Sequence, residues 1–308
     1  YKNYWYSSGI NNTMRSHLKK LVIEAKSFFK KNLKINTLDI GCNDGTLLSY
    51  YPKNFTCFGI DPSQIIKKVS NKKIFKFNDF FPPKKKTSLA FRSKFSIITS
   101  IAMFYDIDNP NKFVKEIKLS LKKNGIWIFE LSYLVDMLRL NSFDTICHEH
   151  LEYYSFQTLK YLMETNGLKI FKVSRNKING GSIRCFVTHI DNDKYENQKY
   201  QKEIKNLMNN EKKLRINNVL IYKKFYKNIL NIKKKLRKLI LAARDKSKKI
   251  YVLGASTKGN TILQFLDLKK NIIQLAVERN KQKIGAKIIG DNITIISEKD
   301  ALKNKPDY

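Results

Sequence analysis

The stretch that decides the fold of this chain lies near its N-terminus and reads Leu38-Asp39-Ile40-Gly41-Cys42-Asn43-Asp44-Gly45. Its apolar half, with the preceding Thr37, predicts a buried strand. Its glycines predict a tight turn in which the backbone passes close under a ligand. Open α/β sheets bind ligands at the carboxyl ends of their strands, and the turn stands at such an end. The stretch therefore predicts the first βα unit of a ligand-binding α/β sheet.

The spacing and charge of this turn indicate which ligand it binds. Gly41 and Gly45 give the pattern GxxxG, whereas a dinucleotide site prefers GxGxxG, which places helix N–H groups on a pyrophosphate. Asp39 and Asp44 flank the glycines, and their charge repels a phosphate but suits an ammonium group. We therefore expect S-adenosylmethionine, a cationic cofactor without phosphate, with Asp39, Gly41, Asn43 and Gly45 around it.

Polar residues follow the next three predicted strands, which cover residues 55–60, 74–77 and 95–99. Asp61 comes 22 residues after Asp39, where a carboxylate can accept both ribose hydroxyls. Asp79 and Phe80 follow the third strand, where an adenine amine can be bound and its ring packed. Ser100, which follows the fourth strand, is expected to line the methionine end.

The remaining pattern predicts an α/β protein with two lobes. A helix over 10–31 precedes the sheet, a helix from Pro110 to Gly125 leads into a fifth strand over 126–130, and a further helix covers 155–166. Strands near 168–174 and 182–189 are separated by Gly180-Gly181, too short for a helical crossover, so we expect an antiparallel pair at the sheet edge. The predicted boundaries are an N-terminal segment 1–34, a Rossmann-like methyltransferase domain 35–190, a helical connector 191–247 and a C-terminal Rossmann-like lobe 248–308.

Composition restricts the class of protein more than it identifies a partner. The net charge of +34 is compatible with an anionic partner, but the lysines are spread along the whole chain, which favours a general compositional bias over a nucleic-acid site. The four cysteines form no CxxC pair, so no zinc site is indicated, and they suit a reducing cytoplasm. No run of eighteen apolar residues occurs, so we predict no membrane span.

A second group of residues with acid–base or metal-binding side chains is Cys147-His148-Glu149-His150. A His-x-His pair can bind a metal, but a third ligand is not evident, and the pair can also be a buried structural feature. The reading we favour is general base catalysis, because an imidazole titrates near neutral pH and an adjacent carboxylate raises its basicity.

These residues and three later stretches resemble the C-methyltransferases that act on nucleotide-linked 4-keto sugars, which belong to the class I S-adenosylmethionine-dependent methyltransferases. The resemblance rests on four ordered motifs and the opening segment Tyr4-Trp5-Tyr6-Ser7-Ser8-Gly9, and runs nearly the full length. The motifs are Phe143–Ser155, Asn179-Gly180-Gly181-Ser182-Ile183-Arg184, Gly254-Ala255-Ser256-Thr257-Lys258-Gly259-Asn260 and Val277–Gly285.

The resemblance implies a mechanism in which a base removes the proton at C3 of the sugar and the enolate takes the methyl group, as in deoxysugar or surface polysaccharide biosynthesis. It implies that His150 is the base, with Glu149 as its partner and His148 beside them, and that Tyr4 and Tyr6 lie near the sugar. No metal is required.

The substrate is expected to bind through its nucleotide as well as its sugar. The turn over 254–260 offers backbone N–H groups and the side chains of Ser256, Lys258 and Asn260 to a diphosphate, although a plain βα bend is an alternative. Arg184 is expected to pair with a phosphate, and Asn179 and Cys147 to contact the substrate.

The sequence departs from the family in two ways. Cys147 stands where the best-known members have a tyrosine, and the small zinc-binding domain with which the family usually begins is absent. We expect the chain to be a fragment at both ends. Two rival functions stay open, an RNA or other small-molecule methyltransferase, suggested by the charge, and a non-catalytic nucleotide-sugar-binding relative, suggested by Cys147.

Overall fold

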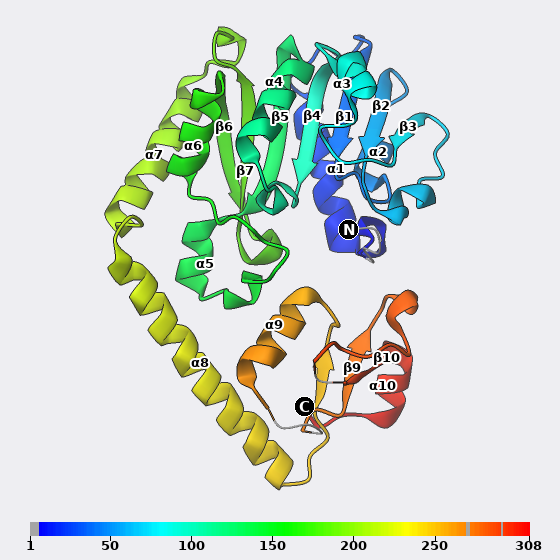
Figure 1. The fold of residues 1–308 in the computed structure, drawn as a ribbon, viewed down its shortest axis with the longest axis vertical. Helices are drawn as coiled ribbons and strands as arrows, with labels where there is room; N and C mark the ends of the chain where they lie inside the picture. The colour runs from blue at the N-terminus through cyan, green and yellow to red at the C-terminus, as the bar shows by residue number, and fades with distance from the viewer. Residues whose placement is uncertain (1–5, 269–271, 291) are drawn as a thin grey trace. The chain divides into compact units, whose positions relative to one another are not determined.

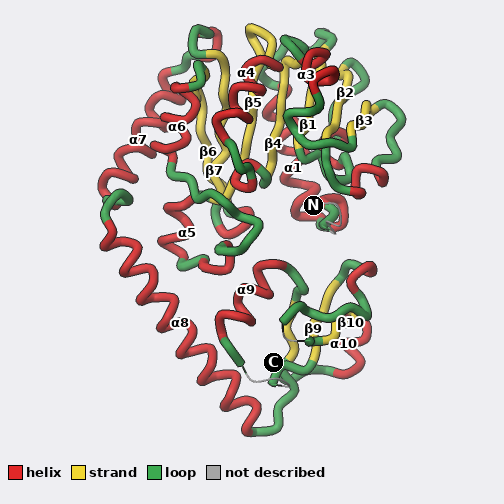
Figure 2. The backbone as a smooth tube through the Cα atoms, in the orientation of Figure 1, coloured by secondary structure: helices red, strands yellow, loops and turns green. Residues whose placement is uncertain are grey.

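The computed structural model describes residues 6–268, 272–290 and 292–308, which form two compact units (Figures 1 and 2). The first unit comprises Tyr1–Leu134 and Leu151–Leu214, and the second comprises Val135–His150 and Arg215–Tyr308. The predicted boundaries at residues 190 and 247 differ from this division. The difference arises because residues 135–150 pack against a helix more than 100 positions later in the chain, which local sequence patterns do not reveal.

A seven-stranded sheet in the order β3-β2-β1-β4-β5-β7-β6 forms the centre of the first unit. Its strands are β1 Ile35–Ile40, β2 Phe55–Ile60, β3 Ile74–Phe77, β4 Phe95–Ile101, β5 Leu121–Ser132, β6 Leu168–Asn176 and β7 Ser182–His189. Strands β1 to β5 pair in parallel, whereas β7 pairs antiparallel with both β5 and β6. This is the class I methyltransferase type of Rossmann-like sheet, and the predicted antiparallel edge pair is confirmed.

Helices cover both faces of this sheet (Figure 1). They are α1 Asn12–Lys26, α2 Thr46–Ser49, α3 Lys85–Phe91, α4 Pro110–Ser120, α6 Phe156–Thr165 and α7 Gln198–Leu214. Side chains of β5 alternate between the two faces, as the period of a strand requires. Ile126 and Ile128 join a core with Leu21 of α1, whereas Trp127 packs against Phe104 and other aromatic rings on the opposite face.

The structure corrects the predicted end of the fourth helix. Asn109 caps α4 by accepting a hydrogen bond from the N–H of Lys112, but the helix ends at Ser120 and not at Gly125. Gly125 lies inside β5, where a Cβ atom would stand 2.9 Å from the carbonyl oxygen of Phe95. The glycine is therefore needed for close strand packing and not for a helix cap.

A buried carboxylate attaches the connector helix α7 to the first unit. Glu211 is fully buried, and its carboxylate accepts hydrogen bonds from the Tyr133 hydroxyl at 2.6 Å and from the N–H groups of Phe156 at 2.6 Å and Gln157 at 3.0 Å. These two N–H groups belong to the first turn of α6, so Glu211 satisfies donors that the helix itself leaves unpaired.

The second unit contains a three-stranded parallel sheet in the order β10-β9-β8. Its elements are α5 Leu134–Leu140, the 3₁₀ segment η4 Phe143–Thr145, α8 Val219–Asp245, β8 Tyr251–Leu253, α9 Thr257–Leu266, β9 Leu275–Glu278, β10 Thr294–Ser297 and α10 Glu298–Asn304. The alternation of strands and helices confirms the expected Rossmann-like C-terminal lobe, and α7 and α8 supply the expected long helices.

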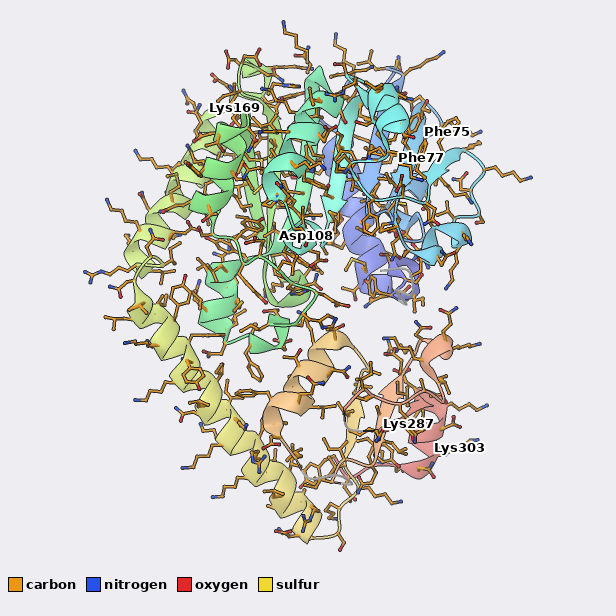
Figure 3. All side chains as sticks on the ribbon, in the orientation of Figure 1. Phe75, Phe77, Asp108, Lys169, Lys287 and Lys303 are labelled. Carbon is orange, nitrogen blue, oxygen red and sulfur yellow. The ribbon has the colours of Figure 1, made fainter. Side chains whose placement is uncertain are left out.

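Positive charge is distributed over both units and is not gathered on one element. Figure 3 shows nitrogen-tipped side chains that project from the helices and loops of each unit, with Lys169 on the first and Lys303 on the second. This distribution agrees with the interpretation that the positive charge reflects a general compositional bias and not a nucleic-acid site. Across residues 6–268, 272–290 and 292–308, no helix combines the length and the apolar character needed to cross a membrane.

Candidate active site

The turn after β1 has the backbone that its glycines predict. Gly41, Asn43 and Gly45 all adopt positive φ, at 71°, 53° and 75°. A Cβ atom on Gly41 would stand 3.1 Å from the Met103 side chain, so a larger residue would be strained as well as crowded. The turn at the carboxyl end of β1 therefore requires glycine at position 41 on both conformational and steric grounds.

Asp61 at the end of β2 fixes this turn. Its Oδ2 accepts a hydrogen bond from the Asn43 N–H at 2.8 Å, and its Oδ1 accepts one from the Ser63 N–H at 2.8 Å. The carboxylate is thus held beside the turn at the strand end that was predicted for a ribose contact. The third predicted contact follows β3, where Asp79 accepts a hydrogen bond from the Phe80 N–H at 2.9 Å and the Phe80 side chain is exposed.

Two predicted cofactor residues point into the protein interior. Asp39 is buried in β1 and accepts a hydrogen bond from the Thr99 hydroxyl at 2.6 Å, and burial raises its pKa to about 7. Ser100 is fully buried, and its hydroxyl accepts a hydrogen bond from the Trp127 indole at 3.1 Å. Both side chains therefore have protein partners within the sheet, and their expected contacts with the cofactor stay predictions.

The N-terminal segment is bound to the cofactor turn, which sequence patterns did not indicate. Asn43 accepts a hydrogen bond from the Ser8 N–H at 2.9 Å and donates one to the Tyr6 carbonyl at 2.9 Å. Asp44 accepts hydrogen bonds from the Ser7 hydroxyl and, at 2.8 Å, from the Gly9 N–H. Of the two tyrosines predicted near the sugar, Tyr6 therefore lies beside the turn, and Tyr4 lies outside the described residues.

Charge and burial at this segment favour a neutral phenol and an ionised carboxylate. Burial, and then the charge of Asp44, raise the pKa of Tyr6 despite a hydrogen bond with Ser8. Burial opposes ionisation of Asp44, but hydrogen bonds from Ser7, Thr46 and Gly9 outweigh it and lower the pKa of that carboxyl. Ser7 and Ser8 lie 35 to 37 positions before the turn residues that they contact, so local sequence patterns gave no signal for this contact.

The His-Glu-His segment belongs to the second unit, where each acid–base group has a partner. His150 Nδ1 lies 2.7 Å from the carbonyl oxygen of Thr145, and Glu149 Oε2 accepts a hydrogen bond from the Thr257 hydroxyl at 3.2 Å. A carbonyl oxygen accepts only, so Nδ1 carries the proton and Nε2 is the basic nitrogen. The adjacent Cys147 is half-buried and forms no disulfide, and His148 is exposed.

The protonation of His150 reflects several opposing influences. Burial lowers its pKa, and the nearby charge of Lys258 lowers it further. The hydrogen bond with the Thr145 carbonyl and the charge of Glu149 act in the opposite direction. The net effect is a pKa below the ordinary value for histidine, so the imidazole is neutral and able to accept a proton at neutral pH.

The turn between β8 and α9 has the features of an anion-binding βα turn. Gly254 adopts φ 97°, and a Cβ atom on Gly259 would stand 2.9 Å from the Gly254 carbonyl oxygen. Ser256 caps α9 by accepting a hydrogen bond from the Gly259 N–H at 3.2 Å, which leaves its hydroxyl proton for a ligand. Lys258 and Asn260 lie half-buried in the first turn of the helix.

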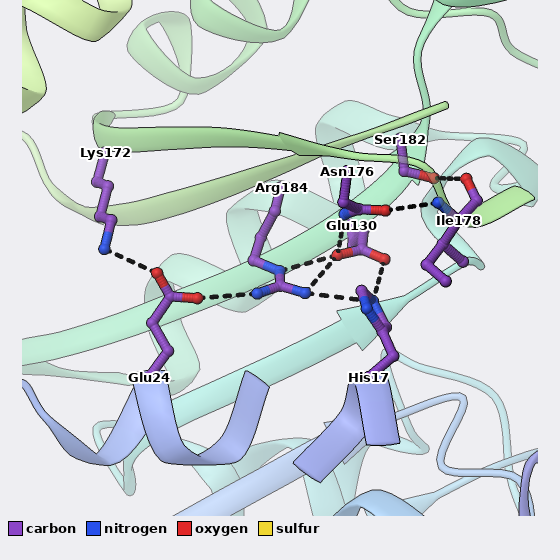
Figure 4. Close-up of polar contacts among 8 residues, drawn as sticks. All are labelled: His17, Glu24, Glu130, Lys172, Asn176, Ile178, Ser182 and Arg184. Carbon is purple, nitrogen blue, oxygen red and sulfur yellow. Dashed lines mark hydrogen bonds and ion pairs between the residues drawn. The ribbon is translucent and has the colours of Figure 1, made fainter. Parts of the chain in front are cut away.

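Arg184, which was predicted to pair with a substrate phosphate, lies instead in a buried ion network (Figure 4). Its guanidinium donates to Glu130 and to Glu24, both at 2.8 Å, and its side chain is 9% exposed. Because protein carboxylates already occupy its donors, we correct the predicted phosphate contact. Asn179, from the same motif, is exposed with φ 54° in the loop that precedes β7.

Comparisons with known proteins cover both halves of the chain. A family model described as "Methyltransferase domain" matches residues 14–173, and one described as "C-methyltransferase C-terminal domain" matches residues 177–308. The curated protein C-methyltransferase NovU of Streptomyces niveus is 29% identical over 205 residues. That alignment covers 67% of this chain and 48% of NovU, so the chain spans about half the length of this relative.

Two solved structures of methyltransferases are similar to part of this chain. An S-adenosylmethionine-dependent methyltransferase from Clostridium acetobutylicum gives a TM-score of 0.45 at 16% identity, and the match covers 57% of this chain and 92% of the Clostridium chain. Magnesium protoporphyrin IX methyltransferase from Synechocystis gives a TM-score of 0.46 at 9% identity, over 58% of this chain and 88% of its own.

Proposed function

This chain belongs to the S-adenosylmethionine-dependent methyltransferase family, and from that premise we propose that it methylates carbon 3 of a nucleotide-linked 4-keto sugar. The single observation that carries the proposal is the pairing of a neutral imidazole with an anion-binding turn in one compact unit. His150 and Glu149 supply the acid–base group, and Ser256, Lys258 and Gly259 supply the turn.

The residues of the first unit suit the cofactor. The backbone at Gly41, Asn43 and Gly45 forms a tight turn with positive φ, and the carboxylates beside it suit a cation and not a phosphate. Asp61 would hold the ribose, Asp79 the adenine amine and Phe80 the adenine ring. When bound, S-adenosylmethionine supplies an electrophilic methyl group.

In the proposed mechanism, Nε2 of His150 removes the proton at C3 of the sugar. The C3–H bond breaks, its electron pair forms a C3=C4 double bond while the C4 carbonyl π electrons move to the C4 oxygen, and the imidazole becomes an imidazolium. Glu149 stabilises that positive charge, and its contribution together with a positioned base is typically worth about 10²–10⁴-fold in rate. Tyr6 is assigned to the sugar from the family resemblance alone, and its raised pKa leaves its phenol protonated and able to donate a hydrogen bond.

The nucleotide would bind in the second unit. The amides at the start of α9, the Ser256 hydroxyl and the Lys258 ammonium are donors of the kind that a diphosphate requires. Glu278 at the end of β9 accepts a hydrogen bond from the Ala255 N–H at 3.2 Å and so holds the turn in shape. The cysteines at 42, 57, 147 and 185 form no disulfide, which suits a reducing compartment, and we propose a cytoplasmic enzyme of deoxysugar or surface polysaccharide biosynthesis.

Calorimetric titration with S-adenosylhomocysteine, alone and with thymidine diphosphate, tests the two binding sites. We expect micromolar binding of S-adenosylhomocysteine and separate binding of a nucleoside diphosphate. Binding of S-adenosylhomocysteine without binding of any nucleoside diphosphate would indicate another methyl acceptor, such as RNA. Absence of cofactor binding by a folded sample would refute it.

The variant His150→Ala tests the mechanism. We expect loss of about 10²–10⁴-fold in turnover with S-adenosylhomocysteine binding retained. Full turnover in this variant would eliminate His150 as the base, and ligand binding without turnover in the unaltered chain would indicate a non-catalytic relative.

A further inference from the structure

The turn at the start of α9 contacts the His-Glu-His segment within the second unit. The Thr257 hydroxyl donates a hydrogen bond to Glu149 at 3.2 Å, and the rings of Phe143 and Phe265 pack with centroids 4.8 Å apart. Both segments belong to the same compact unit, so this contact joins the predicted diphosphate turn directly to the predicted acid–base pair.

Thr257 is placed to fix the Glu149 carboxylate. It is the first residue of α9, directly after the Ser256 cap, so its backbone is held by the helix. Both Thr257 and Glu149 are half-buried, where a hydrogen bond to a charged group is stronger than at an exposed site. A carboxylate held in one position beside an imidazole acts on its protonation more than one that moves freely in solvent.

Lys258 acts on His150 in the opposite direction to Glu149. Its positive charge disfavours the imidazolium, whereas the Glu149 charge and the hydrogen bond from Nδ1 to the Thr145 carbonyl favour it. A phosphate bound at the start of α9 would stand beside the Lys258 ammonium and offset its charge. The imidazole of the free protein would then stay unprotonated, and its proton affinity would rise once an anionic substrate is bound.

We propose that Thr257 is a positioning residue that holds Glu149 beside His150, and that Lys258 makes the strength of the His150 base depend on a diphosphate bound at the α9 turn. The proposal rests on the function proposed above, because it takes the turn as the diphosphate site and His150 as the base. It adds a role for two residues of the turn in proton transfer as well as in binding.

Histidine titration by NMR tests the proposal without any methyl transfer. The full chain, labelled with ¹⁵N in its four histidines, is titrated with and without thymidine diphosphate, and His150→Gln assigns the His150 signal. We expect the His150 midpoint to rise in Lys258→Met. We also expect thymidine diphosphate to raise the His150 midpoint in the unaltered chain but not in Lys258→Met.

Two substitutions at one position separate positioning from packing. Thr257→Val keeps the shape and removes the hydroxyl, so the His150 midpoint should fall as Glu149 is released, whereas Thr257→Ser keeps the hydroxyl and should leave it unchanged. With a keto-sugar substrate, Thr257→Val should reduce kcat about tenfold with little change in KM, as expected for one hydrogen bond to a charged group.

The titrations and the Thr257 substitutions each have an outcome that would overturn the part of the proposal that they test. An unchanged His150 midpoint in Lys258→Met, or in the unaltered chain at high thymidine diphosphate, overturns the dependence on a bound anion. Identical behaviour of Thr257→Val and Thr257→Ser overturns the positioning role. If thymidine diphosphate shifts the His150 midpoint but the chain methylates no keto sugar, the proposed substrate alone is refuted. If the chain methylates a keto sugar but the His150 midpoint does not shift, the coupling alone is refuted.

Discussion

The Nε2 atom of His17 lies 2.7 Å from Oε1 of Glu130, which joins the first helix to the end of the fifth strand. Arg184 contacts the same carboxylate from β7 and reaches Glu24, which in turn accepts a hydrogen bond from Lys172 at 2.7 Å (Figure 4). The charges of this buried network nearly balance, so each carboxylate is paired as burial demands. Helix α1 also carries the N-terminal segment, so the network anchors the element that brings Tyr6 to the cofactor turn.

Removal of Arg184 from this network should destabilise the first unit strongly. We expect Arg184→Gln to lower the free energy of unfolding by about 3–5 kcal/mol, because it leaves two carboxylates without their shared cation. The measurement is urea denaturation followed by circular dichroism. The exposed pair Arg279–Glu298 provides the control, and Arg279→Gln should change stability by less than about 1 kcal/mol. Equal effects of the two substitutions would contradict a buried structural role for Arg184.

The same network should respond to acid. Burial opposes ionisation of Glu130, but the hydrogen bond with His17 and the charge of Arg184 outweigh it and lower its pKa below the usual 4.5. A carboxyl with a lowered pKa contributes stability at pH values above 4.5 that disappears as the pH falls through the folded-state value. This part of the acid dependence should be absent from Glu130→Gln when unfolding is measured between pH 6 and pH 3.

Asp39 should show the opposite dependence on pH. Burial raises its pKa from 3.8 to about 7, so its contribution to stability is fully present below pH 3.8 and is lost as the pH rises through about 7. In Asp39→Asn, which retains an acceptor for the Thr99 hydroxyl, we expect stability relative to the unaltered chain to improve between pH 5 and pH 8 by about 2 kcal/mol. Urea titrations of both proteins at the two pH values measure this change, and a constant difference would show that Asp39 is ionised in the folded state.

The contact between Asn43 and the N-terminal segment should matter for cofactor binding. Asn43→Ala removes the hydrogen bonds with Ser8 and Tyr6 and also replaces a residue at positive φ. We expect S-adenosylhomocysteine to bind about tenfold more weakly, measured by calorimetry, with faster proteolysis before residue 10. Asn71→Ala, which removes only an exposed local hydrogen bond to the Lys73 N–H, is the matched control and should bind like the unaltered chain. Unchanged affinity in Asn43→Ala would separate the N-terminal segment from the cofactor site.

The sequence by itself determined the class of fold and the location of the cofactor turn. Strands 55–60, 74–77 and 182–189 were predicted with the bounds that the structure gives them, because continuous apolar runs between turn residues are local signals. Positive φ at Gly41 and Gly45 followed from the same local chemistry. Motif order alone was enough to indicate a C-methyltransferase.

Only the tertiary structure decided which polar side chains face a ligand and which support the fold. Arg184, Asp39 and Ser100 look like binding residues in the sequence, and their partners Glu130, Thr99 and Trp127 lie 27 to 60 positions away and come together only through strand pairing. Thr257 and Glu149, which share a hydrogen bond, are 108 positions apart in the chain. A hydrogen bond depends on the direction of a side chain and the position of its partner, and for residues far apart in the chain neither is encoded in local sequence.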